Sequence, residues 1–164
     1  MKLKKVVTIF GAGSWGTAIA KNISRNGYMV HLWAKEKEVV DSIIKFRENR
    51  VYLPGIKLPS LIIPTLSLDK VLFKSDFLIF SIPTQFIRES LSAMKNMISK
   101  DSILINTSKG IEQSSMKPIF SIFKETLPRV SKRYVTISGP SLSLIHISEP
   151  TRPRLISYAV FCLK

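Results

Sequence analysis

A glycine-rich turn follows directly on a short apolar run near the start of the chain. The run Val6–Phe10 has the composition of a buried strand, and Gly11, Gly13 and Gly16 follow it with Gly-x-Gly-x-x-Gly spacing. Gly11 permits a tight turn, Gly13 leaves room for a pyrophosphate, and Gly16 lets the next helix pack closely on a sheet. The first amide groups of that helix lack carbonyl partners and attract phosphate. We therefore expect a strand–turn–helix unit that binds a dinucleotide.

The rest of the chain alternates between helical and strand-like patterns. A helix is predicted over Trp15–Asn26, with the apolar side chains Trp15, Ala18, Ile19 and Ile23 on its inward face. Further apolar runs predict strands at Met29–Trp33, Ile62–Leu66, Phe77–Phe80, Ile103–Ile105 and Tyr134–Ile137. This alternation is typical of the α/β class, and we expect a Rossmann-type, doubly wound and mostly parallel sheet.

Composition and net charge indicate which kinds of molecule this chain binds. With 164 residues, 45% of them hydrophobic, the chain can bury the core of one domain. The net charge of +14 invites a nucleic-acid interpretation, but the basic residues are scattered and form no run of five or more. We expect the charge to attract phosphorylated cofactors and substrates instead.

Cys162 is the only cysteine, so no intrachain disulfide can form, and a cytoplasmic location is expected. No apolar run reaches the ~18 residues of a membrane span, and no metal site is predicted.

The residues just after the second predicted strand influence whether the site accepts NAD or NADP. Sites of this kind usually carry an acidic residue there for the adenosine ribose, but the position falls on Ala34, and Lys35 follows. Without a carboxylate, and with a cation beside it, the site would not repel a ribose 2′-phosphate, which favours acceptance of NADP. Glu36 is close enough to counter this effect. Both NAD and NADP are therefore candidates.

Three polar segments follow predicted strands or helices. The Pro/Gly-rich segment 48–59 is predicted to be a long loop that is tethered to the domain. Thr84 is predicted to cap the next helix, with Phe86 in the first turn placed to touch the nicotinamide half of a cofactor. Lys109 stands in a Ser-Lys-Gly turn after the fifth strand, where ligands bind in open α/β sheets.

Six segments carry a family resemblance. They read GAGSWGTAIA, LWAKE, ENRVYLPGIKLP, SIPTQFIR, TSKGIE and SGPS, and begin at residues 11, 32, 48, 81, 107 and 138. The glycine spacing is shared by many dehydrogenases, whereas YLPGIKLP, the PTQF turn and SKGIE in this order are far more specific. Over about residues 4–141 the chain resembles the amino-terminal domain of the NAD(P)-dependent glycerol-3-phosphate dehydrogenases.

The resemblance implies roles for individual residues. Besides the three glycines, the residues implied to line the dinucleotide are Ser14, Trp15, Lys35 and Phe86. Lys109 is implied to contact both cofactor and substrate, and Gly139 and Ser141 to flank the glycerol phosphate. The family interconverts dihydroxyacetone phosphate and sn-glycerol 3-phosphate by hydride transfer with NAD or NADP, for glycerophospholipid synthesis. A homodimer is expected of the full-length protein.

Beyond Ser141 the sequence departs from the family, in which an all-helical substrate domain follows. We expect residues 1–141 to form the dinucleotide-binding domain and residues 142–164 to be an aberrant tail. The peptide Leu142–Pro153 resembles a translated sequencing-library adapter, and a genuine but divergent tail is the alternative. The family's general acid/base is a lysine of the helical domain. No catalytic residue is therefore assigned in this chain, and the fragment is expected to be inactive.

Other function classes stay open from the sequence alone. A related possibility is another dehydrogenase of the same two-domain plan, against which the Tyr-Leu-Pro-Gly segment and Ser-Lys-Gly-Ile-Glu argue. A non-catalytic dinucleotide-binding module is a second class, and a basic nucleic-acid-binding domain is a third. Binding of NADH compared with duplex DNA separates the third class from the others.

Overall fold

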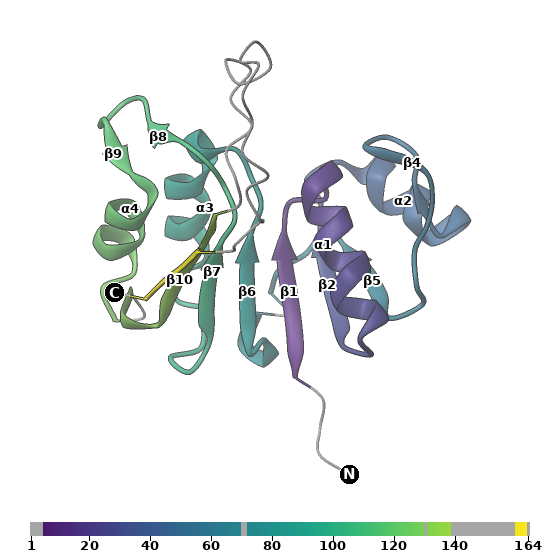
Figure 1. Ribbon diagram of the computed structural model, residues 1–164, viewed down its shortest axis with the longest axis horizontal. Coiled ribbons are helices and arrows are strands. Elements are labelled where there is room, and N and C mark those ends of the chain that lie inside the picture. Colours follow the sequence, from purple (N-terminus) through teal and green to yellow (C-terminus); the bar gives the residue numbers. More distant parts are fainter. Residues whose placement is uncertain (1–4, 70–71, 130, 139–159, 164) are drawn as a thin grey trace, which may run out of the picture.

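One seven-stranded sheet forms the centre of the computed structural model, which describes residues 5–69, 72–129, 131–138 and 160–163 (Figure 1). In chain order its strands are β1 (Val6–Phe10), β2 (Met29–Trp33), β5 (Ile62–Thr65), β6 (Phe77–Phe80), β7 (Ile103–Asn106), β10 (Tyr134–Ser138) and β11 (Val160–Leu163). In space they lie in the order β11-β10-β7-β6-β1-β2-β5.

The strand directions confirm the predicted fold class. Six of the seven strands are parallel, and β11 is antiparallel at the edge beside β10. From central β1 the chain builds outward through β2 to β5 and then crosses back to β6 on the other side of β1. This order is that of the doubly wound dinucleotide-binding fold, in which a crevice opens at the carboxyl ends of the strands where the direction of winding reverses. Here that reversal lies between β1 and β6.

Helices cover both faces of the sheet. They are α1 (Ser14–Arg25), α2 (Lys37–Phe46), α3 (Ile87–Met94) and α4 (Ile119–Thr126). Figure 1 shows α1 and α2 at the β1–β2–β5 half and α3 and α4 at the β6–β7–β10 half. Val7 and Ile9 of β1 enter the apolar cluster on the α1 side, and Phe10 enters the cluster on the α3 side. There the Phe10 ring stacks on Phe80 at 4.7 Å, and Phe80 meets Phe123 edge-on at 4.9 Å. Burial on both faces explains why β6 is apolar throughout and why β1 is apolar except for Thr8, whose buried hydroxyl is hydrogen-bonded to Ser75.

The remaining elements of the described residues are short hairpins and 3-10 helices. They are the hairpins β3 (Glu48–Asn49) with β4 (Leu53–Lys57) and β8 (Ile111–Glu112) with β9 (Lys117–Pro118), and the 3-10 helices η1 (Leu72–Lys74), η2 (Thr84–Phe86) and η3 (Ser131–Arg133). The prediction of a plain loop over residues 48–59 is therefore wrong. Pro54 and Gly55 do not prevent the pairing of β3 with β4, because the register shifts within this hairpin. The Gly55 amide donates to the Glu48 carboxylate at 2.9 Å instead of to a main-chain carbonyl. No helix in the described ranges is long and apolar enough to cross a membrane.

Helix α1 packs on the sheet through small side chains. Its buried residues are Gly16, Thr17, Ala20 and Ser24. Trp15 is 60% exposed, so its prediction as an inward residue is wrong, whereas Ile19 and Ile23 are partly buried against the core. Helix α1 lies so close to the turn before it that no large side chain fits on the side of the helix that faces this turn.

That close approach is visible at the glycines. Gly11 has φ +105°, and a Cβ there would lie 2.3 Å from the Ser81 carbonyl oxygen. A Cβ at Gly16 would lie 1.9 Å from the carbonyl oxygen of Gly11. A Cβ at Gly13 would meet nothing within 4 Å, and Gly13 has φ −66°, which any residue adopts. Two of the glycines are thus required by packing, while the third faces open space.

Replacing Gly16 with Ala is expected to lower the free energy of unfolding by about 2 kcal/mol or more, because the new methyl group would overlap a main-chain oxygen that cannot move freely. Gly13→Ala is the matched control and should change it by less than about 0.5 kcal/mol, as surface substitutions do. Chemical denaturation measures both. Equal stability of the two variants would contradict the close packing of α1 on the turn.

Candidate functional site

A cavity of about 800 Å³ lies at the carboxyl ends of β1, β2 and β6, where the direction of winding reverses. Its walls come from the turn after β1, from the residues that follow β2, β5 and β6, and from one side of α3. Small-molecule sites commonly enclose roughly 300–1,000 Å³. The size and position therefore suit a nucleotide-sized ligand.

The glycine turn forms one wall of this cavity. Gly11 and Gly13 line it, and Gly13 is the N-cap residue of α1 without any side-chain cap. The amides of Ser14, Trp15 and Gly16 donate to no other residue that the structure describes. Unpaired amides at a helix N-terminus, next to open space, suit the charge and size of a pyrophosphate.

The residues after β2 place a cation and a carboxylate in the wall. Ala34 is 1% exposed and does not line the cavity, whereas Lys35 and Glu36 both do. The Lys35 ammonium lies 5.9 Å from the ring centroid of Phe86, which lines the cavity from the start of α3. Glu36 Oε1 accepts a hydrogen bond from the Tyr52 hydroxyl at 3.3 Å. The charge of Glu36 raises the pKa of the Tyr52 phenol, so this hydroxyl stays protonated and able to donate.

The β3–β4 hairpin is fastened to the glycine turn through a buried amide. Asn49 is fully buried, and its Nδ2 donates to Ala12 O at 2.7 Å and to Thr17 Oγ1 at 2.9 Å. Its Oδ1 accepts from the Tyr52 amide at 3.0 Å. The Ser14 hydroxyl donates to the Tyr52 carbonyl at 2.5 Å. The predicted tether of this segment is confirmed, and it holds Tyr52 against the cavity.

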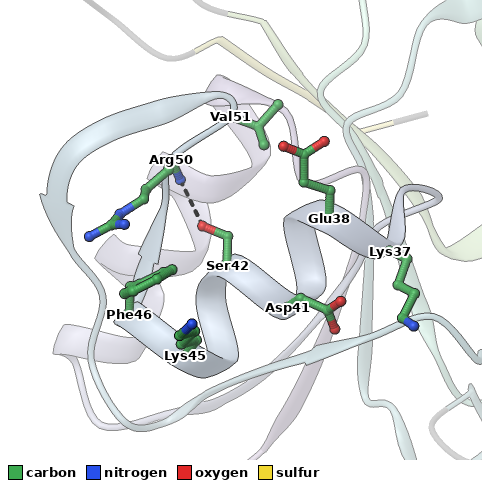
Figure 2. Close-up of a pocket in the computed structure, with 8 residues that line it drawn as sticks. All are labelled: Lys37, Glu38, Asp41, Ser42, Lys45, Phe46, Arg50 and Val51. Atoms are coloured by element: carbon green, nitrogen blue, oxygen red, sulfur yellow. Dashed lines mark hydrogen bonds between the residues drawn. The ribbon is translucent and has the colours of Figure 1, made fainter.

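A second cavity, of about 590 Å³, lies between α2 and the same hairpin (Figure 2). Ser42 Oγ accepts from the Arg50 amide at 3.2 Å and donates to Glu48 O at 2.8 Å. The Arg50 guanidinium lies against the Phe46 ring, 3.5 Å from its centroid. Charges of both signs line this cavity, so it favours neither anions nor cations. We assign these contacts to fastening the base of the hairpin on α2.

The loop that carries Lys109 is fastened to the turn after β6. Thr84 Oγ1 donates to Lys109 O at 2.6 Å, and Ser108 Oγ donates to Ile82 O at 2.6 Å. The prediction that Thr84 caps the next helix is therefore wrong. The turn begins as a 3-10 helix with Pro83 at its N-cap, no side chain caps it, and the Thr84 hydroxyl instead reaches across to the neighbouring loop.

Charged side chains hold the far end of the same loop. Arg88 on α3 donates to Glu112 from Nε at 2.9 Å and from Nη2 at 2.8 Å, and its Nη1 contacts Glu125 at 3.1 Å. The Ser115 hydroxyl also donates to Glu112, and Lys117 pairs with Glu125 at 2.5 Å. The Arg88 hydrogen bonds lower the pKa of the Glu112 carboxyl, which is only 5% exposed. The network joins α3, the β8–β9 hairpin and α4.

The structure brings together part of the predicted site. The predicted cofactor residues that line the cavity are Gly11, Gly13, Lys35 and Phe86. Ser14, Trp15 and Gly16 are the first three residues of α1, beside the cavity, and Lys109 is exposed on the loop beside Thr84. Gly139 and Ser141 lie outside the described residues. Sequence reasoning missed Glu36 and Tyr52 as paired wall residues, because nothing in the sequence indicates that they meet. The described residues contain no group of three or more side chains that could hold a metal ion.

Known proteins resemble this chain in sequence. The family described as NAD-dependent glycerol-3-phosphate dehydrogenase N-terminus matches residues 6–144. The NAD(P)+ glycerol-3-phosphate dehydrogenase of Bacillus velezensis is 43% identical over 138 residues, which cover 84% of this chain and 40% of that protein. That of Syntrophomonas wolfei is 38% identical over 158 residues, which cover 94% of this chain and 45% of that protein. The chain thus spans less than half the length of these relatives.

Solved structures agree with the sequence comparison. Glycerol-3-phosphate dehydrogenase from Coxiella burnetii superimposes with a TM-score of 0.76 at 28% identity, covering 85% of this chain and 42% of that one. The enzyme from Saccharomyces cerevisiae superimposes with a TM-score of 0.74 at 28% identity, and the match covers 85% of this chain and 43% of that one. Both matches concern less than half of the compared chain.

Replacing Glu112 with Gln is expected to lower stability at neutral pH, because Arg88 would lose its main charged partner. The pKa of Glu112 in the folded state lies below its ordinary value of 4.5. The stabilisation is therefore present above about pH 4.5 and is lost as the pH falls through the folded-state pKa. Denaturant midpoints measured from pH 7 to pH 3 should fall less steeply with acid in E112Q than in the unaltered chain. The exposed Glu89 on α3 provides the control, and E89Q should behave as the unaltered chain does. An unchanged acid dependence in E112Q would contradict the contribution of this ion pair.

Proposed function

Because this chain belongs to the family of NAD-dependent glycerol-3-phosphate dehydrogenase amino-terminal domains, we propose that its main cavity binds a nicotinamide dinucleotide with the pyrophosphate at the glycine turn. The observation that carries this proposal is the open space beside Gly13, next to amides that have no partner among the described residues. A Cβ at this position would fill that space, and a helix N-terminus adds a favourable dipole. The residues present therefore fit the group.

For the whole protein we propose the interconversion of dihydroxyacetone phosphate and sn-glycerol 3-phosphate, in the cytoplasm, for glycerophospholipid synthesis and as a homodimer. The bound nicotinamide supplies the hydride acceptor or donor. Lys109 is proposed to stabilise phosphate charge or a developing oxyanion of the substrate. Its loop is held by Thr84 and by the Arg88–Glu112 pair, which supports a defined position for this lysine. Gly139 and Ser141 are proposed to flank the glycerol phosphate.

Both NAD and NADP are proposed as cofactors. Lys35 lines the cavity and forms no ion pair with a carboxylate in the described part of the chain, so it can meet a ribose 2′-phosphate. Ser14 and Trp15 at the start of α1, and Phe86 just before α3, are proposed to contact the dinucleotide.

We also propose that the native domain ends near residue 141 and that residues 142–164 are foreign to the gene. The family match to residue 144 supports this boundary, whereas the alignment over 94% of the chain with the Syntrophomonas wolfei relative counts against it. Sequencing the genomic locus across Ser141 decides the matter. A natural stop codon after Lys164 would overturn the proposal.

Gly13→Val is expected to abolish binding of NADH while the chain stays folded, because the side chain would occupy the space proposed for the pyrophosphate. NADH fluorescence titration measures the affinity, and circular dichroism checks the fold. Duplex DNA in ~0.15 M salt is the comparator for the unaltered chain, because screening at that ionic strength suppresses non-specific charge effects. Unchanged NADH affinity in G13V, or binding of DNA without NADH, would refute the proposed site.

A further inference from the structure

The β3–β4 hairpin reaches the main cavity at one point. Of its residues, only Tyr52 lines the cavity. Its main chain is held on both sides, because its amide donates to Asn49 and its carbonyl accepts from Ser14. The hairpin base is fastened independently to α2 through Ser42. The Tyr52 phenol is therefore presented to the cavity from a fixed main chain.

The partner of that phenol is Glu36, the first carboxylate in the chain after β2. Glu36 is the N-cap residue of α2, yet its side chain makes no capping hydrogen bond. Its Oε1 instead accepts from the Tyr52 hydroxyl at 3.3 Å. A carboxylate free at the end of β2 would accept hydrogen bonds from a ribose and would repel a 2′-phosphate. The Tyr52 hydroxyl occupies one acceptor site of this carboxylate from the side of the hairpin.

The Lys35 side chain, by contrast, makes only a weak contact. Its ammonium lies 5.9 Å from the centre of the Phe86 ring, a contact with an exposed side chain. An exposed contact of this kind is worth only about 0.5–1 kcal/mol, so a phosphate can displace it readily. Two adjacent residues with opposite charges thus line one cavity, and of the two only Glu36 has a hydrogen-bond partner among the described residues.

From this arrangement we propose that Tyr52 is a specificity-determining residue, which lets the cavity accept the 2′-phosphate of NADP by holding Glu36 away from the ribose. The proposal rests on the proposed function, because it concerns the same dinucleotide site. Tyr52 acts through Glu36 and not through its own contact with the cofactor. That distinction makes the proposal testable by a double-mutant cycle.

The first test is Y52F in the chain as it exists. NADH and NADPH are titrated separately, with nicotinamide fluorescence as the readout, and the ratio of their dissociation constants is compared. Because this hydrogen bond is exposed, its loss should shift the ratio toward NADH by about two- to tenfold. The fold is expected to persist, because the hydrogen bonds that hold this residue come from its main chain. Y28F is the matched control, because Tyr28 is equally exposed (39% for both) and lies before the opposite end of β2.

The second test removes the carboxylate. E36Q should shift the ratio toward NADPH, and the double variant Y52F/E36Q should match E36Q, because the phenol then has no carboxylate to restrain. An additional loss of NADPH preference in the double variant would overturn the proposal, since Tyr52 would then act on the cofactor itself. An unchanged ratio in Y52F, or an equal shift in Y28F, would overturn it as well. If the unaltered chain bound neither dinucleotide, the proposed function would fail first.

Discussion

The contact between the start of α1, the turn before it and the end of β6 is the constraint on which the rest depends. Gly16 lies against the Gly11 carbonyl, and Gly11 lies against the Ser81 carbonyl, at distances that exclude any side chain. The Ser81 amide donates to Phe10 O at 2.8 Å, which continues the pairing of β6 with β1. Because three main-chain segments meet here without side chains between them, the amides of α1 open onto the cavity where the direction of winding reverses.

A hairpin and a loop complete the cavity and its surroundings, and each is held by side chains that bond to main-chain groups. Asn49 fixes the β3–β4 hairpin on the glycine turn, and Thr84 fixes the Lys109 loop on the turn after β6. Hydrogen bonds of this kind fix such segments in place, since each satisfies a main-chain group that water would otherwise have to reach. The Arg88–Glu112 pair adds charge to the second attachment. Tyr52 and the Lys109 loop are therefore positioned by polar contacts, whereas other wall residues, such as Ile82 and Met94, belong to the apolar core.

Local patterns predicted the elements well where burial on both faces demands apolar runs, as at Phe77–Phe80. They failed where a residue's role depends on what faces it. Trp15 has the right spacing for an inward position, but the close approach of α1 admits only small side chains. Thr84 has the chemistry of a helix cap, but the neighbouring loop offers its hydroxyl a better acceptor. The Pro/Gly content of residues 48–59 signals a loop, although a hairpin forms.

By itself the sequence determined the fold class and the glycine turn, because strand burial, glycine spacing and helix periodicity are local properties of neighbouring residues. It also carried the family, through motifs such as YLPGIKLP and SKGIE. Only the tertiary structure decided which polar side chains meet. Glu36 and Tyr52 are separated by a helix and a strand, and their hydrogen bond exists because Asn49 seats the hairpin on the turn. Such a contact depends on three-dimensional packing between distant segments, which no local pattern encodes.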